Sequence, residues 1–273
     1  MSGWLDPVRH ALDEAPIPVT FFFRDDDAGW DDDRLLALLE LFAAPALPID
    51  LAVIPTAVTA SLARTLRGRV EATPELVGVH QHGFAHVNHE PDGRRYEFGP
   101  ARSTTAQRED IEQGRRRLWD LLGSAVQPIF TPPWNRCTVV TGECVRDLGF
   151  AILSRDASAH PLELPGLLEL PIRLDWAARP KGIRLTHTEL GQRLAHQVRA
   201  QGPIGIMFHH AVMDATERAV LGELLDLLAR HSRARCRAMS AVLDTATTAA
   251  VPGARDGWPS FSPVRDLPEE LER

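Results

Sequence analysis

Short apolar runs alternate with helical stretches along almost the whole chain, about eight times in all. The predicted strands cover 19–23, 49–54, 76–80, 127–130, 150–153, 167–174, 204–208 and 235–239. The predicted helices cover 1–15, 35–42, 57–66, 107–122, 139–148, 189–200 and 216–231. Strands that alternate with helices form a parallel sheet with the helices outside, and this number of strands favours a closed or nearly closed barrel. The sequence therefore predicts an α/β fold of the (β/α) barrel type.

One domain accounts for most of the chain. Residues 1–250 are expected to form the barrel, and 251–273 are rich in proline and charge and are expected to be a C-terminal tail. The polar stretch 91–105 contains Gly93, Gly99 and Pro100 and is predicted to be a long surface loop. Because it follows the histidine-rich segment described below, it is expected to act as a lid or a substrate-binding rim.

Composition excludes several classes of function. A net charge of -7 argues against nucleic-acid binding, which requires a basic surface. No apolar run approaches the roughly 20 residues of a membrane span, and the amino terminus lacks the pattern of a secretion signal. The three cysteines have no ligand spacing, which predicts free thiols in a reducing compartment. A cytoplasmic protein is expected.

Polar clusters follow several of the predicted strands. Four histidines lie between 80 and 89, and His82 and His86 are four residues apart, a spacing that puts two imidazoles on one face of a helical turn. The run 24–27 (Arg-Asp-Asp-Asp) follows the first strand, and buried carboxylates are costly unless they are paired or bind a cation. Since the carboxyl ends of barrel strands meet at one face, the sequence predicts a metal site with two histidines and one carboxylate.

The order of these clusters resembles the polysaccharide deacetylase family, the carbohydrate esterases related to chitooligosaccharide deacetylase. The order is Asp-Asp, His-x-x-x-His, Pro-Pro-Trp and a strand-end histidine, and it covers about residues 19–240. The segment 82–86 (His-Gly-Phe-Ala-His) carries the resemblance best, and the flanking elements are diverged. The resemblance implies a distorted (β/α) barrel of about seven strands, and a divalent metal, most commonly zinc, that serves to hydrolyse an acetyl group from a sugar.

The resemblance also implies roles for two adjacent aspartates, of which the first is the catalytic base and the second is a metal ligand. With Asp25 counted as the residue before the pair, Asp26 is the base, and Asp27 binds the metal together with His82 and His86. The alternative register makes Asp25 the base and Asp26 the ligand. Three consecutive aspartates leave both registers open.

A second element, Thr131-Pro132-Pro133-Trp134, resembles the family's Arg-x-Pro-Tyr. The resemblance implies that Trp134 offers a backbone N–H to the oxyanion, and its ring could form the floor of a sugar site. Thr131 stands near the place of the family's arginine. Arg24 or Arg136 is therefore expected to orient the catalytic aspartate instead.

The remaining roles fall after the later strands. His209 follows the apolar run 204–208, and the resemblance implies that it is the general acid that protonates the leaving group. Asp175, followed by Trp176, resembles the aspartate that tunes this acid, and His210 could exchange roles with His209. The residues expected to bind substrate are Trp134, Asn135, Arg136 and His210.

These expectations describe a metal-dependent deacetylase that acts on an N- or O-acetylated sugar or glycoconjugate. Without a secretion signal, a cytoplasmic glycoconjugate precursor is the expected substrate. One alternative is a metal-dependent amidase for a non-sugar amide. The other is a non-catalytic carbohydrate-binding protein on the same barrel, which would bind sugar without metal and without turnover.

Overall fold

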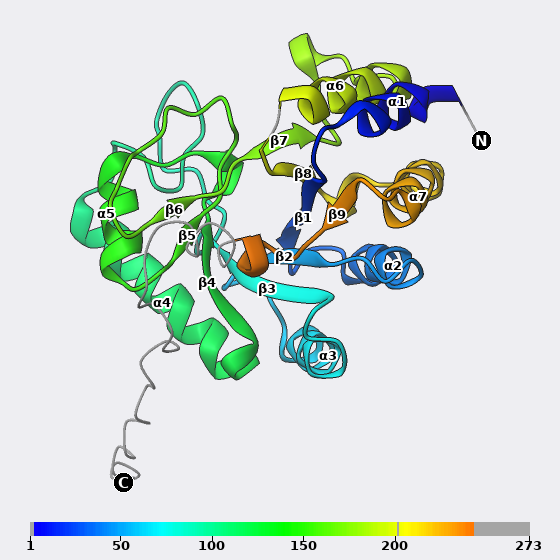
Figure 1. The fold of residues 1–273 in the computed structure, drawn as a ribbon. Coiled ribbons are helices and arrows are strands. Elements are labelled where there is room, and N and C mark those ends of the chain that lie inside the picture. The colour runs from blue at the N-terminus through cyan, green and yellow to red at the C-terminus, as the bar shows by residue number, and fades with distance from the viewer. Residues whose placement is uncertain (1–2, 201, 243–273) are drawn as a thin grey trace, which may run out of the picture.

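The computed structural model describes residues 3–200 and 202–242, in which nine strands form one parallel sheet with helices around it (Figure 1). The strands are β1 (Val19–Ala28), β2 (Ile49–Val53), β3 (Val77–His82), β4 (Val126–Thr131), β5 (Ile152–Leu153), β6 (Leu168–Glu169), β7 (Ile172–Asp175), β8 (Ile204–Phe208) and β9 (Ala234–Cys236). The helices are α1 (Asp6–Glu14), α2 (Asp32–Ala43), α3 (Ala60–Ala72), α4 (Thr104–Leu122), α5 (Val139–Asp147), α6 (His187–Ala200) and α7 (Ala215–Arg230).

Strand β1 lies between β2 and β8 in the sheet, and its first residues also pair with β9. Successive side chains of a strand point to opposite faces. Accordingly, Phe21 and Phe23 pack in the large core between the sheet and the helices, whereas Phe22 packs in a smaller core formed by several strands inside the barrel. By the same alternation, Arg24 and Asp26 point into the barrel with Phe22, and both are almost fully buried. The periodicity of β1 thus brings two charged residues inside the barrel.

The sheet closes through one bent segment of chain. Strands β6 and β7 stand at opposite ends of the strand order, yet only residues 170–171 separate them along the chain. On one side of this segment, a parallel bridge between Asp156 and Ile172 continues the pairing of β5 with β6. On the other side, Ile172 pairs with Gly205 of β8. With β6 and β7 taken as one bent strand, the ring from β1 to β8 has seven strands, and the predicted distorted barrel is confirmed.

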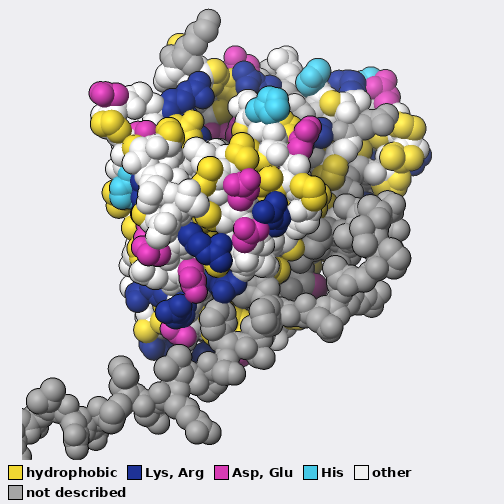
Figure 2. All heavy atoms as spheres, turned by 90° about the vertical axis from the view of Figure 1, so that its left-hand side faces the viewer, with side chains coloured by type: hydrophobic (Ala, Val, Ile, Leu, Met, Phe, Trp, Pro, Cys, Tyr) yellow, Lys and Arg dark blue, Asp and Glu magenta, His cyan; other side chains and the backbone are white. Residues whose placement is uncertain are grey.

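Helix starts follow ordinary capping chemistry. Side-chain oxygens accept a backbone N–H of the first turn at the starts of α3, α4, α5 and α7, and the capping residues are Thr59, Ser103, Thr138 and Asp214. On the face that Figure 2 shows, basic and acidic side chains are interspersed with hydrophobic ones and do not gather by sign.

Differences from the predicted elements are local. Strand β1 continues to Ala28 instead of ending at residue 23, so the aspartates belong to the strand. The predicted strand 167–174 is divided at Pro171, a residue that has no N–H to offer a ladder. The long loop predicted over 91–105 is present before α4, but it covers residues 83–103. The expected boundary at residue 250 and the tail 251–273 lie outside the described residues. Within the described residues, no helix combines the length and hydropathy that a membrane crossing requires.

Candidate active site

The end of β1 is irregular, and this irregularity brings adjacent aspartates to one site. Asp25 pairs with Leu51 of β2, but Ala28 pairs with Val53, so β1 carries one extra residue over this interval. Asp27 lies within the bulge with a left-handed backbone, φ 69°. Bulges of this kind re-aim a side chain. In a regular strand Asp27 would point away from Asp26, whereas here both carboxylates lie at the carboxyl ends of the strands, which we call the barrel mouth.

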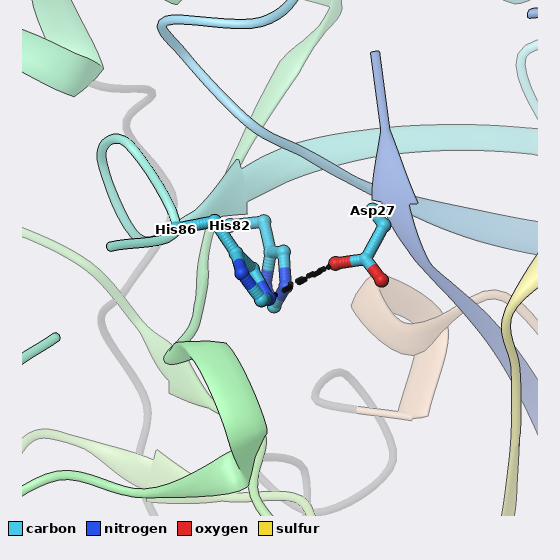
Figure 3. A group of neighbouring side chains, drawn as sticks. All are labelled: Asp27, His82 and His86. Atoms are coloured by element: carbon cyan, nitrogen blue, oxygen red, sulfur yellow. Dashed lines mark ion pairs between the residues drawn. The ribbon is translucent and has the colours of Figure 1, made fainter. Parts of the chain in front are cut away.

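Asp27, His82 and His86 converge at the barrel mouth (Figure 3). Oδ1 of Asp27 lies 3.2 Å from Nε2 of His82 and 3.1 Å from Nε2 of His86. Despite these distances, this buried oxygen has no hydrogen-bond partner with acceptable geometry. Three ligand atoms held tetrahedrally by zinc at about 2.1 Å would lie roughly 3.4 Å apart. The donor set, its spacing and the unsatisfied carboxylate oxygen therefore fit a divalent metal.

A hydrogen bond fixes the tautomer of His82. Its Nδ1–H donates to the carbonyl oxygen of Thr131 at 3.0 Å, which leaves the lone pair of Nε2 facing Asp27. Such a bond is the usual support of a metal-ligating histidine. Burial alone would lower the pKa of His82, but the carboxylates of Asp27 and Asp26 outweigh burial and raise it. The negative charge at the site thus favours a cation.

The His-x-x-x-His segment is not helical, and the predicted helical turn is wrong. His82 ends β3, and His86 lies in the loop that follows, with φ 56°. Glu97, which is fully buried, shapes this loop by accepting the backbone N–H groups of Phe84 at 3.0 Å and Ala85 at 2.7 Å. At Gly83, with φ 55°, a Cβ would lie 2.1 Å from a Glu97 oxygen, so this position requires glycine. No sequence pattern identified Glu97, which lies in the stretch predicted to be a polar loop.

Two tryptophans enclose the His86 ring. The ring centroid of His86 lies 4.5 Å from that of Trp134 and 4.8 Å from that of Trp30, and both contacts are edge to face. Trp134 belongs to η3 (Pro133–Asn135) and has a left-handed backbone, φ 55°, as does Asn135, φ 59°. Trp30 was not among the predicted site residues, although an aromatic residue soon after a strand end was a usable signal. The tryptophans fix the orientation of a ring that comes from a loop.

Arg24 is the arginine that holds Asp26. Its Nε and Nη2 donate to the two carboxylate oxygens of Asp26, at 2.7 and 2.9 Å. The same guanidinium donates to Ser154 Oγ at 2.7 Å and to Asn135 Oδ1 at 2.6 Å. The other arginine considered from sequence, Arg136, donates among the described residues only to the carbonyl oxygen of Arg95, at 3.4 Å. Arg24, in β1, therefore supplies the positive charge beside Asp26. Thr131, in β4, stands near the place of the family's arginine but has no charge.

This pairing sets the ionisation of Asp26. Burial alone would raise the pKa of the carboxyl, but Arg24, together with His82 and His209, outweighs burial and lowers that pKa. Asp26 is thus a carboxylate at neutral pH. A carboxylate has about four lone-pair sites, so the bidentate contact with Arg24 leaves acceptor capacity for a further proton donor.

Asp25 and His210 lie outside the site. Asp25 Oδ1 accepts the backbone N–H of His210 at 3.0 Å, and Oδ2 accepts Nδ1–H at 2.6 Å. The other ring nitrogen of His210 contacts the carbonyl oxygen of Trp30 at 2.5 Å, and the side chains of Asp25 and His210 are both 0% exposed. The expectation that His210 binds substrate is therefore corrected, because its ring is buried and both of its nitrogens are engaged. For the same reason the structure does not bring Asp25 to the metal ligands.

His209 is half-buried at the end of β8, where it interacts electrostatically with the carboxylates of Asp26, Asp27 and Asp175. Asp175 ends β7, and its Oδ1 accepts the backbone N–H of Ala177 at 2.8 Å. Burial, with the nearby Asp26 carboxylate, raises the pKa of Asp175 although His209 opposes the shift. His209 and Asp175 thus lie together on the side of the barrel mouth formed by β7 and β8.

A cleft of about 1010 Å³ opens beside these residues. Its inner end is lined by Trp134, Asn135, Asp175 and Met207. Asn135 and Met207 also contact the guanidinium of Arg24, so the cleft reaches the Arg24–Asp26 pair. Arg136, another residue expected to bind substrate, lines the same cleft. A ligand in this cleft would contact Trp134 and lie next to the predicted metal ligands.

No sequence-family model and no curated protein matches this chain. Solved structures do match it. A protein from Mycobacterium smegmatis, named as a polysaccharide deacetylase, matches with a TM-score of 0.67 and 14% identity over 90% of this chain and 96% of that one. A family 4 acetyl xylan esterase from Clostridium thermocellum, in complex with a cobalt ion, has a TM-score of 0.56 and 12% identity over 83% and 91% of the two chains.

A CE4 family pseudoenzyme from Bacillus anthracis also matches, with a TM-score of 0.56 and 11% identity over 85% of this chain and 67% of that one. At these identities a shared fold does not by itself assign an activity. The resemblance that the sequence predicted is thus confirmed at the level of architecture: this chain has the fold of the polysaccharide deacetylases and family 4 carbohydrate esterases.

Proposed function

We propose that the protein is a metal-dependent hydrolase that removes an acetyl group from an N- or O-acetylated sugar or glycoconjugate. One observation carries the proposal: the triad Asp27, His82 and His86 lies at the same barrel mouth as the buried pair of Arg24 and Asp26. Hydrolysis of an amide or ester at neutral pH needs a Lewis acid and a base for the attacking water. The fold shared with a named deacetylase and a named esterase supports this reading.

The metal would be held by Asp27, His82 and His86. Two imidazoles and one carboxylate are a ligand set well suited to zinc. When bound, it would supply Lewis acidity for the acyl carbonyl and for the attacking water. Every other requirement falls to side chains and backbone groups of the chain.

Asp26 is the proposed base. It is ionised because Arg24 lowers the pKa of its carboxyl, and it can accept the proton that the attacking water gives up as its oxygen bonds to the acyl carbon. Arg24 also fixes the plane of the carboxylate through two hydrogen bonds, so the acceptor lone pairs keep one orientation. This positioning spares the reaction part of the entropy cost of aligning base and water.

Collapse of the tetrahedral intermediate breaks the bond from the acyl carbon to the sugar nitrogen or oxygen. His209 is proposed to donate a proton to that leaving atom, and Asp175 to tune His209 from the adjacent strand. The backbone N–H of Trp134 is the proposed donor to the oxyanion, and its indole the floor of the sugar site. The strained backbone of Trp134 is consistent with a functional constraint there.

The decisive experiment is acetate release by purified protein from a panel of N- and O-acetylated sugars, after removal of metal and after addition of zinc or cobalt. Acetate release that depends on added metal supports the proposal. A protein that binds one divalent ion but releases no acetate from any acetylated sugar would overturn it.

Two other functions are separated by the same panel. Turnover of a non-sugar acyl amide alone would indicate a metal-dependent amidase. The match to a pseudoenzyme of this fold raises a second candidate, a carbohydrate-binding protein without turnover. That candidate predicts sugar binding that is unaffected by a chelator, whereas the proposed enzyme loses all acetate release.

A further inference from the structure

The cleft beside the site is rich in arginine. Five arginines line it, against two aspartates, Asp156 and Asp175. The arginines are Arg94, Arg136, Arg155, Arg179 and Arg193. This excess contrasts with the chain as a whole, which has a net charge of -7.

The arginines reach the cleft from separate parts of the chain. Arg94 lies in the loop before α4, and Arg193 lies on α6. The others follow strands: Arg136 comes after β4, Arg155 after β5 and Arg179 after β7. A cluster assembled from five segments is not the by-product of one basic run in the sequence. The fold concentrates positive charge at the barrel mouth.

Most of these arginines form no ion pair with the residues that the structure describes. Among the described residues, Arg155 is the only one of the five with a carboxylate within ion-pair distance, that of Glu169. Although Arg155 is only 5% exposed, its Nε has no hydrogen-bond partner. Arg94 and Arg179 are exposed to solvent. Exposed guanidinium groups without a carboxylate partner remain able to pair with an anion that enters the cleft.

The two acidic residues of the cleft do little to neutralise it. Asp175 interacts electrostatically with His209, and its Oδ1 accepts the backbone N–H of Ala177 at 2.8 Å. Asp156 uses Oδ1 to accept the backbone N–H of Ser158 at 2.8 Å, as a turn residue does. Positive charge therefore dominates the cleft, from Trp134 at its inner end to Arg94 and Arg179 on its rim.

We propose that this cleft binds an anionic group of the substrate, so that the enzyme prefers acetylated sugars that carry a carboxylate or a phosphate. The inference rests on the proposed deacetylase function for the acetyl group, which would lie at the metal ligands. Arginine suits the anion because its planar guanidinium binds carboxylate and phosphate oxygens in pairs. A cleft of about 1010 Å³ exceeds what one small sugar fills, and so leaves room for a charged substituent.

The test compares a neutral substrate with two anionic ones of the same sugar series: N-acetylglucosamine, its 6-phosphate, and N-acetylmuramic acid, which carries a carboxylate. We expect kcat/KM to be about tenfold higher for at least one anionic sugar, mainly through a lower KM, because guanidinium–anion contacts are strong charge-assisted bonds. The preference should shrink when salt is raised to screen the cleft. Preference for one anion alone identifies the group.

The matched variant is the double substitution Arg94→Gln, Arg179→Gln, at two exposed positions of the rim. It should lower kcat/KM for the anionic sugar about tenfold and leave the neutral sugar nearly unchanged. Arg64→Gln, an exposed arginine of α3 that does not line the cleft, is the control and should change neither.

A binding measurement separates failure of this inference from failure of the proposed function. The Kd of each sugar is measured by calorimetry in the unmodified protein and in the double variant. Tighter binding of the anionic sugars that depends on the arginines, without acetate release, would support the cleft and overturn the deacetylase. Acetate release at equal kcat/KM from neutral and anionic sugars would overturn the cleft assignment and leave the deacetylase standing. A preference that survives in the double variant would also overturn the assignment.

Discussion

Strand β1 contributes one aspartate to each of two groups of aspartate and histidine. The two groups differ in solvent exposure and in hydrogen bonding. Asp25 and His210 are 0% exposed in their side chains, and each polar atom of the pair has a partner. Two residues further along β1, Asp27 lies beside His82 and His86 and is 14% exposed, with an oxygen that lacks a hydrogen bond. The first group is saturated by the protein, and the second is left open.

The difference gives a criterion for separating a structural group from a candidate functional one. The buried pair of Asp25 and His210 joins β1 to the segment after β8, and its polar side-chain atoms have no free donor or acceptor for a ligand. The open group also lies where backbone strain collects. Of the seven non-glycine residues with positive φ in the described part of the chain, Asp27, His86, Trp134 and Asn135 are at the site. Strain persists where the surrounding structure fixes it, and it is typical of functional sites.

The largest effect is expected from removing the open group's imidazoles. The double substitution His82→Ala, His86→Ala leaves one carboxylate ligand, so bound metal and acetate release should both fall to background. Metal content by mass spectrometry and acetate release check this. His89→Ala, an exposed histidine of the same segment, is the control and should keep both. Full metal occupancy in the double variant would remove the distinction between the two groups.

The aspartate next to the open group should affect rate but not metal. Asp26→Asn should keep the metal and lower kcat by roughly 10²–10⁴, which is the usual contribution of a positioned base. Asp27→Asn should weaken metal binding itself, because it removes the anionic ligand. Titration of zinc into metal-free variants, with kcat measured at saturating metal, distinguishes the two. Loss of metal in Asp26→Asn, with only rate lost in Asp25→Asn, would restore the alternative register.

The barrel could be predicted because its signal is periodic. Buried parallel strands are continuous apolar runs, and β2, β3 and β8 were recognised on that basis. The bounds of strands β5, β6 and β7 depend on pairing between strands across the sheet. The order of apolar residues along the chain does not contain this information. The spacing of His82 and His86 predicted that the two rings meet, but for the wrong geometric reason, since a strand end and a strained loop replace the helical turn.

Contacts between distant segments were beyond the sequence. Nothing in the polar stretch 91–105 distinguishes Glu97 from an exposed acid, yet it is buried and binds two backbone N–H groups of the His86 loop. His210 was grouped with His209 because the two are adjacent. Adjacent residues at a strand end point in different directions, and here one lies at the barrel mouth and the other pairs with Asp25.

A smaller effect on rate is expected at His209. His209→Ala removes the proposed proton donor to the leaving group, so kcat should fall by about 10² at neutral pH. The loss should be greater for an amide than for an activated aryl ester, whose leaving group needs no proton. Measurement of kcat on both substrates at neutral pH checks this. An unchanged kcat for the amide in His209→Ala would mean that the leaving group takes its proton from another residue.

Substitution in the pair of Asp25 and His210 is expected to have the smallest effect on metal binding and turnover. Its effect on stability is expected to be the largest. His210→Ala leaves the buried Asp25 carboxylate without its partner, so the free energy of unfolding should fall by about 3–5 kcal/mol. Folded protein should still bind one metal and keep its kcat within about twofold, because neither residue lies at the barrel mouth. Denaturant unfolding and metal titration at low temperature check both. Loss of metal from folded His210→Ala would make the pair part of the site.

The same pair predicts a pH dependence of stability in the unmodified protein. Burial alone would lower the pKa of His210, but Asp25 outweighs burial and raises it to about 9. Because the folded pKa lies above the usual 6.5, the contribution to stability is complete below about pH 6.5 and is lost as pH rises through about 9. The difference corresponds to about 3 kcal/mol. The Tm should therefore fall between pH 6.5 and 9, and the fall should be much smaller in His210→Ala. An equal fall in both proteins would mean that His210 is neutral in the fold, and that Asp25 and His210 form an ordinary hydrogen bond and no ion pair.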